Sequence, residues 1–101
     1  MNIPKEITKL FLTRDKAVGK NDKELFLSTQ VGEIEYSSVE GYFSIDVLKT
    51  EVLYIYSESD LEKVVFVKEN YFPKKKVSRI SFIIYFLANT VGGWKIYKLR
   101  Y

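Results

Sequence analysis

The chain has 101 residues, a length at which a single domain, residues 1–101, buries about two-thirds of its unfolded surface. It contains no cysteine and no histidine, which excludes disulfides, thiolate metal sites and the Cys or Ser-His nucleophiles of many enzymes. The formal net charge of +3 is too small to single out nucleic acid as a partner, and no cofactor is predicted.

A helix is predicted near the start of the chain, because apolar residues recur at helical spacing over residues 3–18. Arg14 occupies one of the positions on this apolar face. Asn21 or Asp22 then caps a second, short helix that runs to about Thr29. The first third of the chain therefore predicts a helix, a polar kink and a further helical turn.

After Gly32 the apolar pattern changes to a period of two residues, which is typical of β-strands. A short strand is predicted at residues 34–36, and four longer strands over residues 42–56, 61–72, 77–88 and 94–101. Helices followed by a run of antiparallel strands indicate an α+β domain. The expected architecture is an N-terminal helix and a short helix packed on a curved antiparallel sheet of four to five strands.

The last two predicted strands form a hairpin with large apolar side chains on both faces, so both faces must be covered. One face can pack on the chain's own helix, which leaves the other for a second subunit or a ligand. A homodimer is predicted on this outer face, through six residues: Ile83, Tyr85, Leu87, Tyr97, Leu99 and Tyr101. The alternative is that sheet curvature turns this face into the core and leaves Phe82 and Trp94 outside.

Acid-base catalysis would use carboxylates or tyrosines inside a pocket, and the candidates are Asp15, Asp46, Tyr42 and Tyr54. The competing interpretation places Asp15 on the solvated side of the helix, Asp46 on an outer strand face and the tyrosine hydroxyls at a rim. We favour that interpretation, so no catalytic residue is predicted. The acidic stretch at residues 58–62 lacks the glycine and the ligand register of a calcium loop, and no metal site is predicted.

One basic loop follows two aromatic residues and is a candidate anion-binding site. Its residues are Lys74, Lys75, Lys76 and Arg79. Such a cluster can hold a phosphate backbone while bases stack on the aromatic rings. A lysine cluster at a hairpin tip is more often a solvated turn, so nucleic-acid binding is the less favoured interpretation.

The chain resembles the nuclear transport factor two-like, or cystatin-like, cone-shaped superfamily. The resemblance is carried by Ala17 followed by Asn21-Asp22 and Phe26, by the middle stretch at residues 64–71, and by Gly92-Gly93-Trp94-Lys95-Ile96. It implies a helix laid across a bent sheet, an internal pocket between them, and dimerisation through the outer face of the sheet. It does not imply one activity, because the superfamily includes isomerases, dehydratases, transport adaptors and accessory domains of secretion machines.

The sequence thus predicts a non-catalytic binding or assembly module whose partner is a second copy or another protein, with room for a small ligand in a pocket. The alternatives are a pocket enzyme of the same fold, of the isomerase, dehydratase or hydrolase kind, and a nucleic-acid-binding domain. The longest apolar run, residues 80–88, is far shorter than the roughly 20 residues of a membrane-spanning helix. No signal peptide is recognised, so the expected compartment is the cytoplasm, or outside it if the chain is a trimmed piece of a longer protein.

Overall fold

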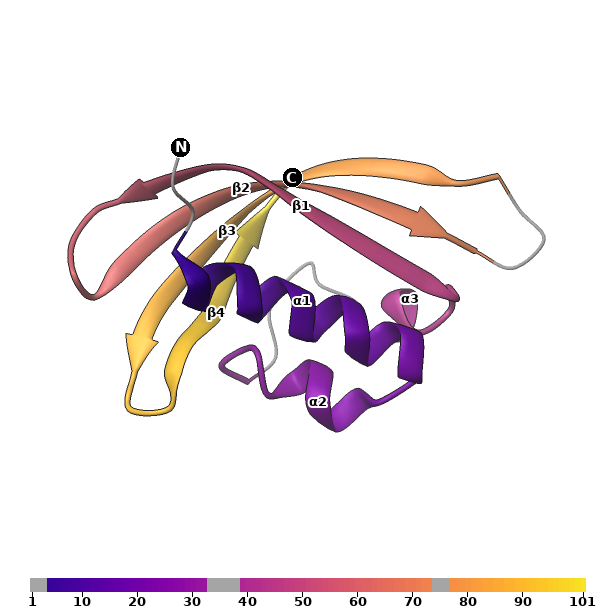
Figure 1. Ribbon diagram of the computed structural model, residues 1–101, viewed down its shortest axis with the longest axis horizontal. Helices are drawn as coiled ribbons and strands as arrows, with labels where there is room; N and C mark the ends of the chain where they lie inside the picture. The colour runs from indigo at the N-terminus through magenta and orange to yellow at the C-terminus, as the bar shows by residue number, and fades with distance from the viewer. Residues whose placement is uncertain (1–3, 33–38, 74–76) are drawn as a thin grey trace.

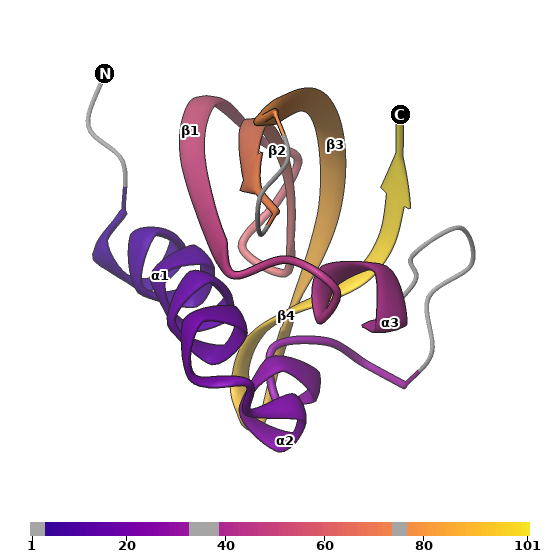
Figure 2. The ribbon, with the colours of Figure 1, turned by 90° about the vertical axis from the view of Figure 1, so that its right-hand side faces the viewer.

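A computed structural model describes residues 4–32, 39–73 and 77–101. Within these residues three helices precede four strands: α1 (Lys5–Lys20), α2 (Lys23–Leu27), α3 (Val39–Tyr42), β1 (Val47–Ser57), β2 (Glu62–Phe72), β3 (Arg79–Thr90) and β4 (Gly93–Arg100). The strands form one antiparallel sheet in the order β1-β2-β3-β4. The sheet is bent, and the helices gather on its concave side (Figures 1 and 2). The predicted α+β architecture is confirmed.

The helical region begins and ends where local chemistry favours it. Helix α1 ends at Asn21, whose φ of 56° is the left-handed conformation that terminates many helices. Asp22 then caps α2, since its Oδ1 accepts a 3.1 Å hydrogen bond from the backbone N–H of Leu25. The helix, kink and short helix predicted for this region are present.

Two predicted boundaries differ from the structure. The strand predicted from residue 42 begins at Val47 instead, because Val39–Tyr42 forms a short helix, α3, and β1 starts only after it. The short strand predicted at residues 34–36 lies outside the described residues.

The main core lies between α1 and the concave face of the sheet. Ile7, Leu10 and Phe11 of α1 meet a set of inward-facing strand residues, namely Val65, Val67, Ile83, Tyr85, Leu87, Ile96 and Leu99. A second cluster joins the end of α1 to α2, α3 and the start of β1. Phe26 of α2 is its fully buried centre. These two clusters bury most of the large apolar side chains of the helices and fix how α1 crosses the sheet.

The predicted orientation of β3 and β4 is wrong. Ile83, Tyr85, Leu87 and Leu99 are at most 3% exposed and face α1, so they form the core of the monomer and not an outer interface. The opposite face of β3 points outward, and Phe82 is 64% exposed there. Trp94, which the alternative reading placed outside, is half-buried and packs against the core.

One irregularity in β4 explains why the sequence pattern does not predict which residues of this hairpin face the core. The pairs Leu87–Ile96 and Phe86–Lys98 leave Tyr97 as an extra residue, a β-bulge. Strict alternation would place Tyr97 and Leu99 on one face, but the bulge sends Leu99 inward and leaves Tyr97 exposed. The predicted set of six residues is therefore divided between the core and the surface.

Candidate functional site

A fully buried carboxylate, Glu69, occupies the concave face of the sheet. It lies on β2 in the same alternation as Val65 and Val67, where apolar residues would be expected. A buried charge is costly unless hydrogen bonds replace its lost water. Tyrosine hydroxyls supply those bonds, from Tyr42 on α3 at 2.7 Å, Tyr71 on β2 at 2.5 Å and Tyr85 on β3 at 2.5 Å.

The tyrosine hydroxyls act as donors in this network, which we call the Glu69 network: Glu69, Tyr42, Tyr71 and Tyr85. Burial is the main cause that raises the pKa of Tyr42 and of Tyr85 well above the ordinary value. Burial and the neighbouring Glu69 charge also raise the pKa of Tyr71. The three hydroxyls therefore stay protonated, and the Glu69 carboxylate accepts a hydrogen bond from each of them.

A buried cation faces the same core from the helix side. Arg14 of α1 is 1% exposed, and its guanidinium lies 4.1 Å from the centroid of the Phe26 ring and 5.5 Å from that of Tyr85. Its Nη1 donates to Thr29 Oγ1 at 2.8 Å and to Gln30 Oε1 at 3.2 Å. Arg14 and Glu69 thus place opposite charges in one interior, with tyrosine rings between them.

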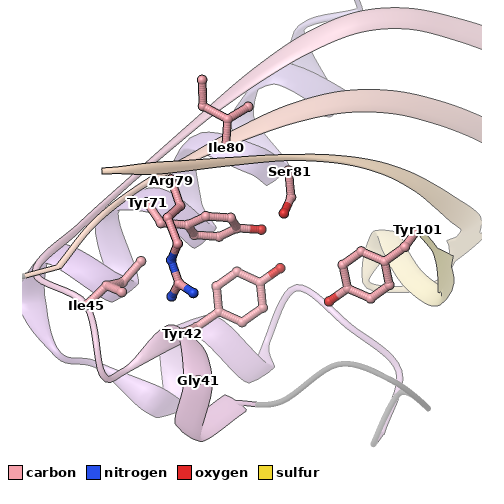
Figure 3. A pocket seen from close by; sticks show the side chains of 8 residues that line it. All are labelled: Gly41, Tyr42, Ile45, Tyr71, Arg79, Ile80, Ser81 and Tyr101. Atoms are coloured by element: carbon pink, nitrogen blue, oxygen red, sulfur yellow. The ribbon is translucent and has the colours of Figure 1, made fainter. Parts of the chain in front are cut away.

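An open cavity of about 320 Å³ lies beside the Glu69 network. It is bounded by the segment around α3, the end of β2, the start of β3 and the residue after β4, through Gly41, Tyr42, Ile45, Tyr71, Arg79, Ile80, Ser81 and Tyr101. Figure 3 shows the side chains of Tyr42, Tyr71 and Ser81 turned toward one another, with the Arg79 guanidinium beside them. Tyr42 forms a buried floor, whereas Arg79 and Tyr101 form an exposed rim.

Comparison with known proteins identifies the architecture. No family model and no curated protein matches the sequence. A solved NTF-2 like protein of unknown function from Shewanella oneidensis superposes with a TM-score of 0.78 over 93% of each chain, at 11% identity. A protein of unknown function with a cystatin-like fold from Nostoc punctiforme gives 0.68 over 98% of this chain and 92% of that one, at 12% identity. The chain has the nuclear transport factor two-like fold.

A third structure with the nuclear transport factor two-like fold carries an enzyme's name. It is a ketosteroid isomerase-like protein from Erwinia carotovora atroseptica, with a TM-score of 0.61, 13% identity, and coverage of 92% of this chain and 89% of that one. Identities this low establish a shared fold and leave the chemistry to be argued from the side chains of this chain.

The structure separates the residues proposed from sequence for acid-base chemistry. Tyr42 lies in the cavity floor, as part of the Glu69 network. Asp15 instead joins α1 to β1, accepting the Thr50 backbone N–H at 2.8 Å and the Thr50 hydroxyl at 2.6 Å. Asp46 is exposed just before β1, and Tyr54 is exposed, with its ring 5.9 Å from that of Phe66. These four side chains do not form a common site.

Asp15 was expected on the solvated side of the helix, and this expectation is wrong. Its carboxyl is partly buried against β1, and burial raises its pKa to about 6. The charge of Glu69 acts in the same direction, whereas the hydrogen bonds from Thr50 oppose it.

The proposed anion-binding residues are only partly placed. Lys74, Lys75 and Lys76 lie outside the described residues. Arg79 lies at the start of β3 and borders the cavity. Of the proposed dimer residues, Tyr101 is 71% exposed and also borders this cavity, so it belongs to the candidate site.

Sequence reasoning missed Glu69 and its partners Tyr71 and Tyr85. A signal was present, because Glu69 interrupts an apolar alternation that starts with Val65 and Val67. A charged residue in the buried phase of a strand indicates a hydrogen-bonded interior site. Tyr71, two residues further on the same face, is the nearest donor that the sequence offers.

Proposed function

We propose that this protein is a non-catalytic binding module that holds a small molecule in the cavity beside the Glu69 network. The observation that carries this proposal is the direction of the hydroxyl protons: Tyr42, Tyr71 and Tyr85 all donate to Glu69. The raised pKa values of these tyrosines oppose loss of a proton at neutral pH. The groups suit recognition better than proton transfer.

The rival function, a pocket enzyme, needs a general acid or base that reaches the ligand. Glu69 has no exposed surface and its two oxygens already accept three hydroxyls. Asp15, whose pKa of about 6 suits a base, is bound to Thr50 and does not border the cavity. These placements favour binding over catalysis for the described part of the chain.

The size of the cavity sets the size of its ligand. About 320 Å³ is at the lower end of the range of roughly 300 to 1,000 Å³ found for small-molecule pockets. We therefore expect a ligand of one ring or a short chain, which contacts the Tyr42 and Tyr71 rings and reaches the rim at Tyr101.

Fragment screening by two-dimensional amide NMR tests the binding function. We expect saturable shifts for some fragments that are confined to Tyr42, Tyr71, Ser81 and Tyr101. A bulky substitution in the cavity lining, Ile45→Trp, should abolish them while the amide spectrum stays that of a folded protein, whereas Val91→Trp at the exposed β3–β4 turn should not. A library that produces no saturable shifts at the cavity at millimolar concentrations would overturn the proposal.

Assembly through the sheet is the second part of the proposed function, now on the face opposite to the one predicted from sequence. The convex face carries Tyr54, Tyr56, Ile80 and Phe82, which are between 49% and 64% exposed. Exposed apolar groups gathered on one face are typical of protein interfaces. The occupant we propose is a second copy of the chain, packed sheet against sheet, with Phe82 as an aromatic anchor.

Sedimentation equilibrium of single variants tests this interface. Phe82→Glu should convert a dimer into a folded monomer, because it places a charge at the centre of the contact. Val91→Glu is the matched control, since Val91 is at least as exposed but lies at the tip of the β3–β4 turn. A wild-type chain that stays monomeric at several hundred micromolar would rule out the dimer.

A further inference from the structure

We propose that the cavity selects small carboxylic acids that also carry a hydrogen-bond donor, with the carboxylate at Arg79 and the donor at the oxygens of Tyr42 and Tyr71. This inference rests on the proposed binding function and adds the chemical class of the ligand. It follows from counting donors and acceptors on the cavity wall.

The tyrosine end of the cavity offers acceptors. A hydroxyl has one proton, and those of Tyr42 and Tyr71 are directed at Glu69. What each oxygen can still present to a ligand is a lone pair. The Tyr42 oxygen also lies 3.0 Å from that of Tyr85, and the Ser81 hydroxyl bonds the oxygen of Tyr71, so at most one acceptor position remains at each. A ligand hydroxyl or amine can donate to these oxygens, whereas a ligand carbonyl or anion placed there would meet lone pairs and leave them unmatched.

The rim offers the opposite chemistry. A guanidinium has five N–H donors and no acceptor, and its planar fork matches a carboxylate. Arg79 borders the cavity, is exposed, and has no ion-pair or hydrogen-bond partner within the described residues. It is the one cationic side chain among the cavity residues that the structure describes, so an anionic group of the ligand belongs at this end.

Charge limits the anion to a single negative charge. Glu69 lies behind the tyrosines, and its charge contributes to raising the pKa of Tyr71 and of Tyr101 on two sides of the cavity. Its field therefore reaches the space that a ligand would fill. One guanidinium balances a monoanion, whereas the second charge of a phosphate monoester would face Glu69 with nothing described to offset it.

The body of the ligand is apolar and small. Ile45 and the rings of Tyr42 and Tyr71 line the space between the two polar ends, and Figure 3 shows Arg79 on the Ile45 side of these rings. The side chain of Ile80 points to the other side of the strand and leaves this space open (Figure 3). A hydroxylated aromatic acid has the required arrangement of anion, ring and donor.

Three matched probes test the inference by NMR titration of the intact protein. 4-Hydroxybenzoate carries both groups, 4-hydroxybenzamide replaces the carboxylate by a neutral isostere, and benzoate lacks the donor. We expect 4-hydroxybenzoate to bind at least about tenfold more tightly than either of the other two, a difference of about 1.4 kcal/mol.

Two arginine variants locate the preference for an anion. Arg79→Gln should lower the affinity for 4-hydroxybenzoate to that of the amide and leave the amide unchanged. Arg100→Gln is the control, because Arg100 is an exposed arginine of β4 that is absent from the cavity wall. A preference for the acid that survives Arg79→Gln would overturn the assignment of the carboxylate to Arg79.

The outcomes separate this inference from the function on which it rests. If neutral fragments or the amide bind at the cavity as tightly as the acid, the binding module stands and the selection of carboxylates fails. Inorganic phosphate binding there more tightly than 4-hydroxybenzoate would also refute the monoanion. If neither the probes nor any library fragment shifts the cavity residues, both the inference and the binding function are wrong.

Discussion

The Tyr85 hydroxyl on β3 donates a 2.5 Å hydrogen bond to the Glu69 carboxylate on β2, and neither side chain has any exposed surface. The bond joins the two central strands through their side chains, in addition to the backbone ladder in which Val65 pairs with Tyr85. A hydrogen bond to a charged group contributes more than one between neutral groups.

Tyr85→Phe should therefore destabilise the protein by about 1.5 to 3 kcal/mol, because Glu69 stays buried with one donor fewer. Urea unfolding followed by circular dichroism measures the change. Tyr97→Phe is the control: the Tyr97 hydroxyl is 3.4 Å from Glu62 on the surface, and its loss should change stability by less than about 0.5 kcal/mol. Equal effects of the two substitutions would show that burial adds nothing to the Tyr85 bond.

Arg14 provides a second prediction. Arg14→Met keeps much of the side-chain volume but removes the cation and the donor to Thr29 and Gln30, and leaves the buried charge of Glu69 without a counter-charge. We expect a loss of about 1 to 3 kcal/mol, the cost of leaving buried polar groups unmatched. The larger cost of breaking a direct ion pair does not apply, because among the described residues Nε and Nη2 of Arg14 are buried without a hydrogen-bond partner. Lys16→Met, on the exposed side of the same helix, should have little effect.

A double-mutant cycle tests the electrostatic origin of that loss. If the charges of Arg14 and Glu69 interact, Arg14→Met should cost less in a Glu69→Gln background than in the wild type. The same cost in both backgrounds would assign the effect of Arg14 to packing on Phe26 and to its polar contacts alone.

Asp15 predicts a dependence of stability on pH. Its pKa is about 6 in the folded protein and 3.8 when unperturbed, so between these values the native state binds more protons than the unfolded state. This contribution is fully present below about pH 4 and is lost as the pH rises to about 6. Allowing for the partial exposure of the carboxyl, we expect about 1 to 2 kcal/mol.

The measurement compares wild type with Asp15→Asn across this pH range. Asparagine can still accept the Thr50 backbone N–H, but it does not titrate. The unfolding free energy of the wild type minus that of Asp15→Asn should decrease between about pH 4 and pH 6, and stay level above about pH 7. A difference that is constant, or that favours the wild type as pH rises, would contradict the raised pKa.

Asn21 predicts the effect of backbone strain at the kink between α1 and α2. Its φ of 56° is adopted easily by glycine, tolerated by asparagine and unfavourable for a β-branched residue. Asn21→Gly should be at least as stable as the wild type, whereas Asn21→Val should cost about 1 to 2 kcal/mol. Thermal unfolding of the two variants gives the comparison, and equal stabilities would show that this conformation carries no strain.

The fold was predictable because its signals are local. The change from helical to alternating periodicity near Gly32, and the cap at Asp22, each depend on a few neighbouring residues. The phase of the last hairpin was not predictable in this way. Both faces of β3 are apolar, and what decides between them is contact with α1, which is distant in the sequence.

The candidate site depends on distant contacts in the same way. Glu69 accepts hydrogen bonds from Tyr42, which lies 27 positions earlier in the sequence, and from Tyr85, which lies 16 positions later. No spacing rule links a residue of a helical turn to two strands, so the alternation around Glu69 could indicate a buried polar site but not the donors that complete it. The fold brings Arg79 and Ser81 of β3 to the cavity that Tyr42 and Tyr71 also line.

Both outer strands of the sheet also have part of their free backbone occupied. On β1, the Thr50 N–H is taken by Asp15, and on β4, Ile96 donates its N–H to Thr29 and accepts from the N–H of Val31, in a short parallel bridge. An extended strand from another molecule would find these positions filled and would have to displace a helix carboxylate or a neighbouring segment to continue the ladder. The fold therefore discourages fibrous growth from strand to strand, even with many β-branched and aromatic residues, and directs association to the convex face of the sheet.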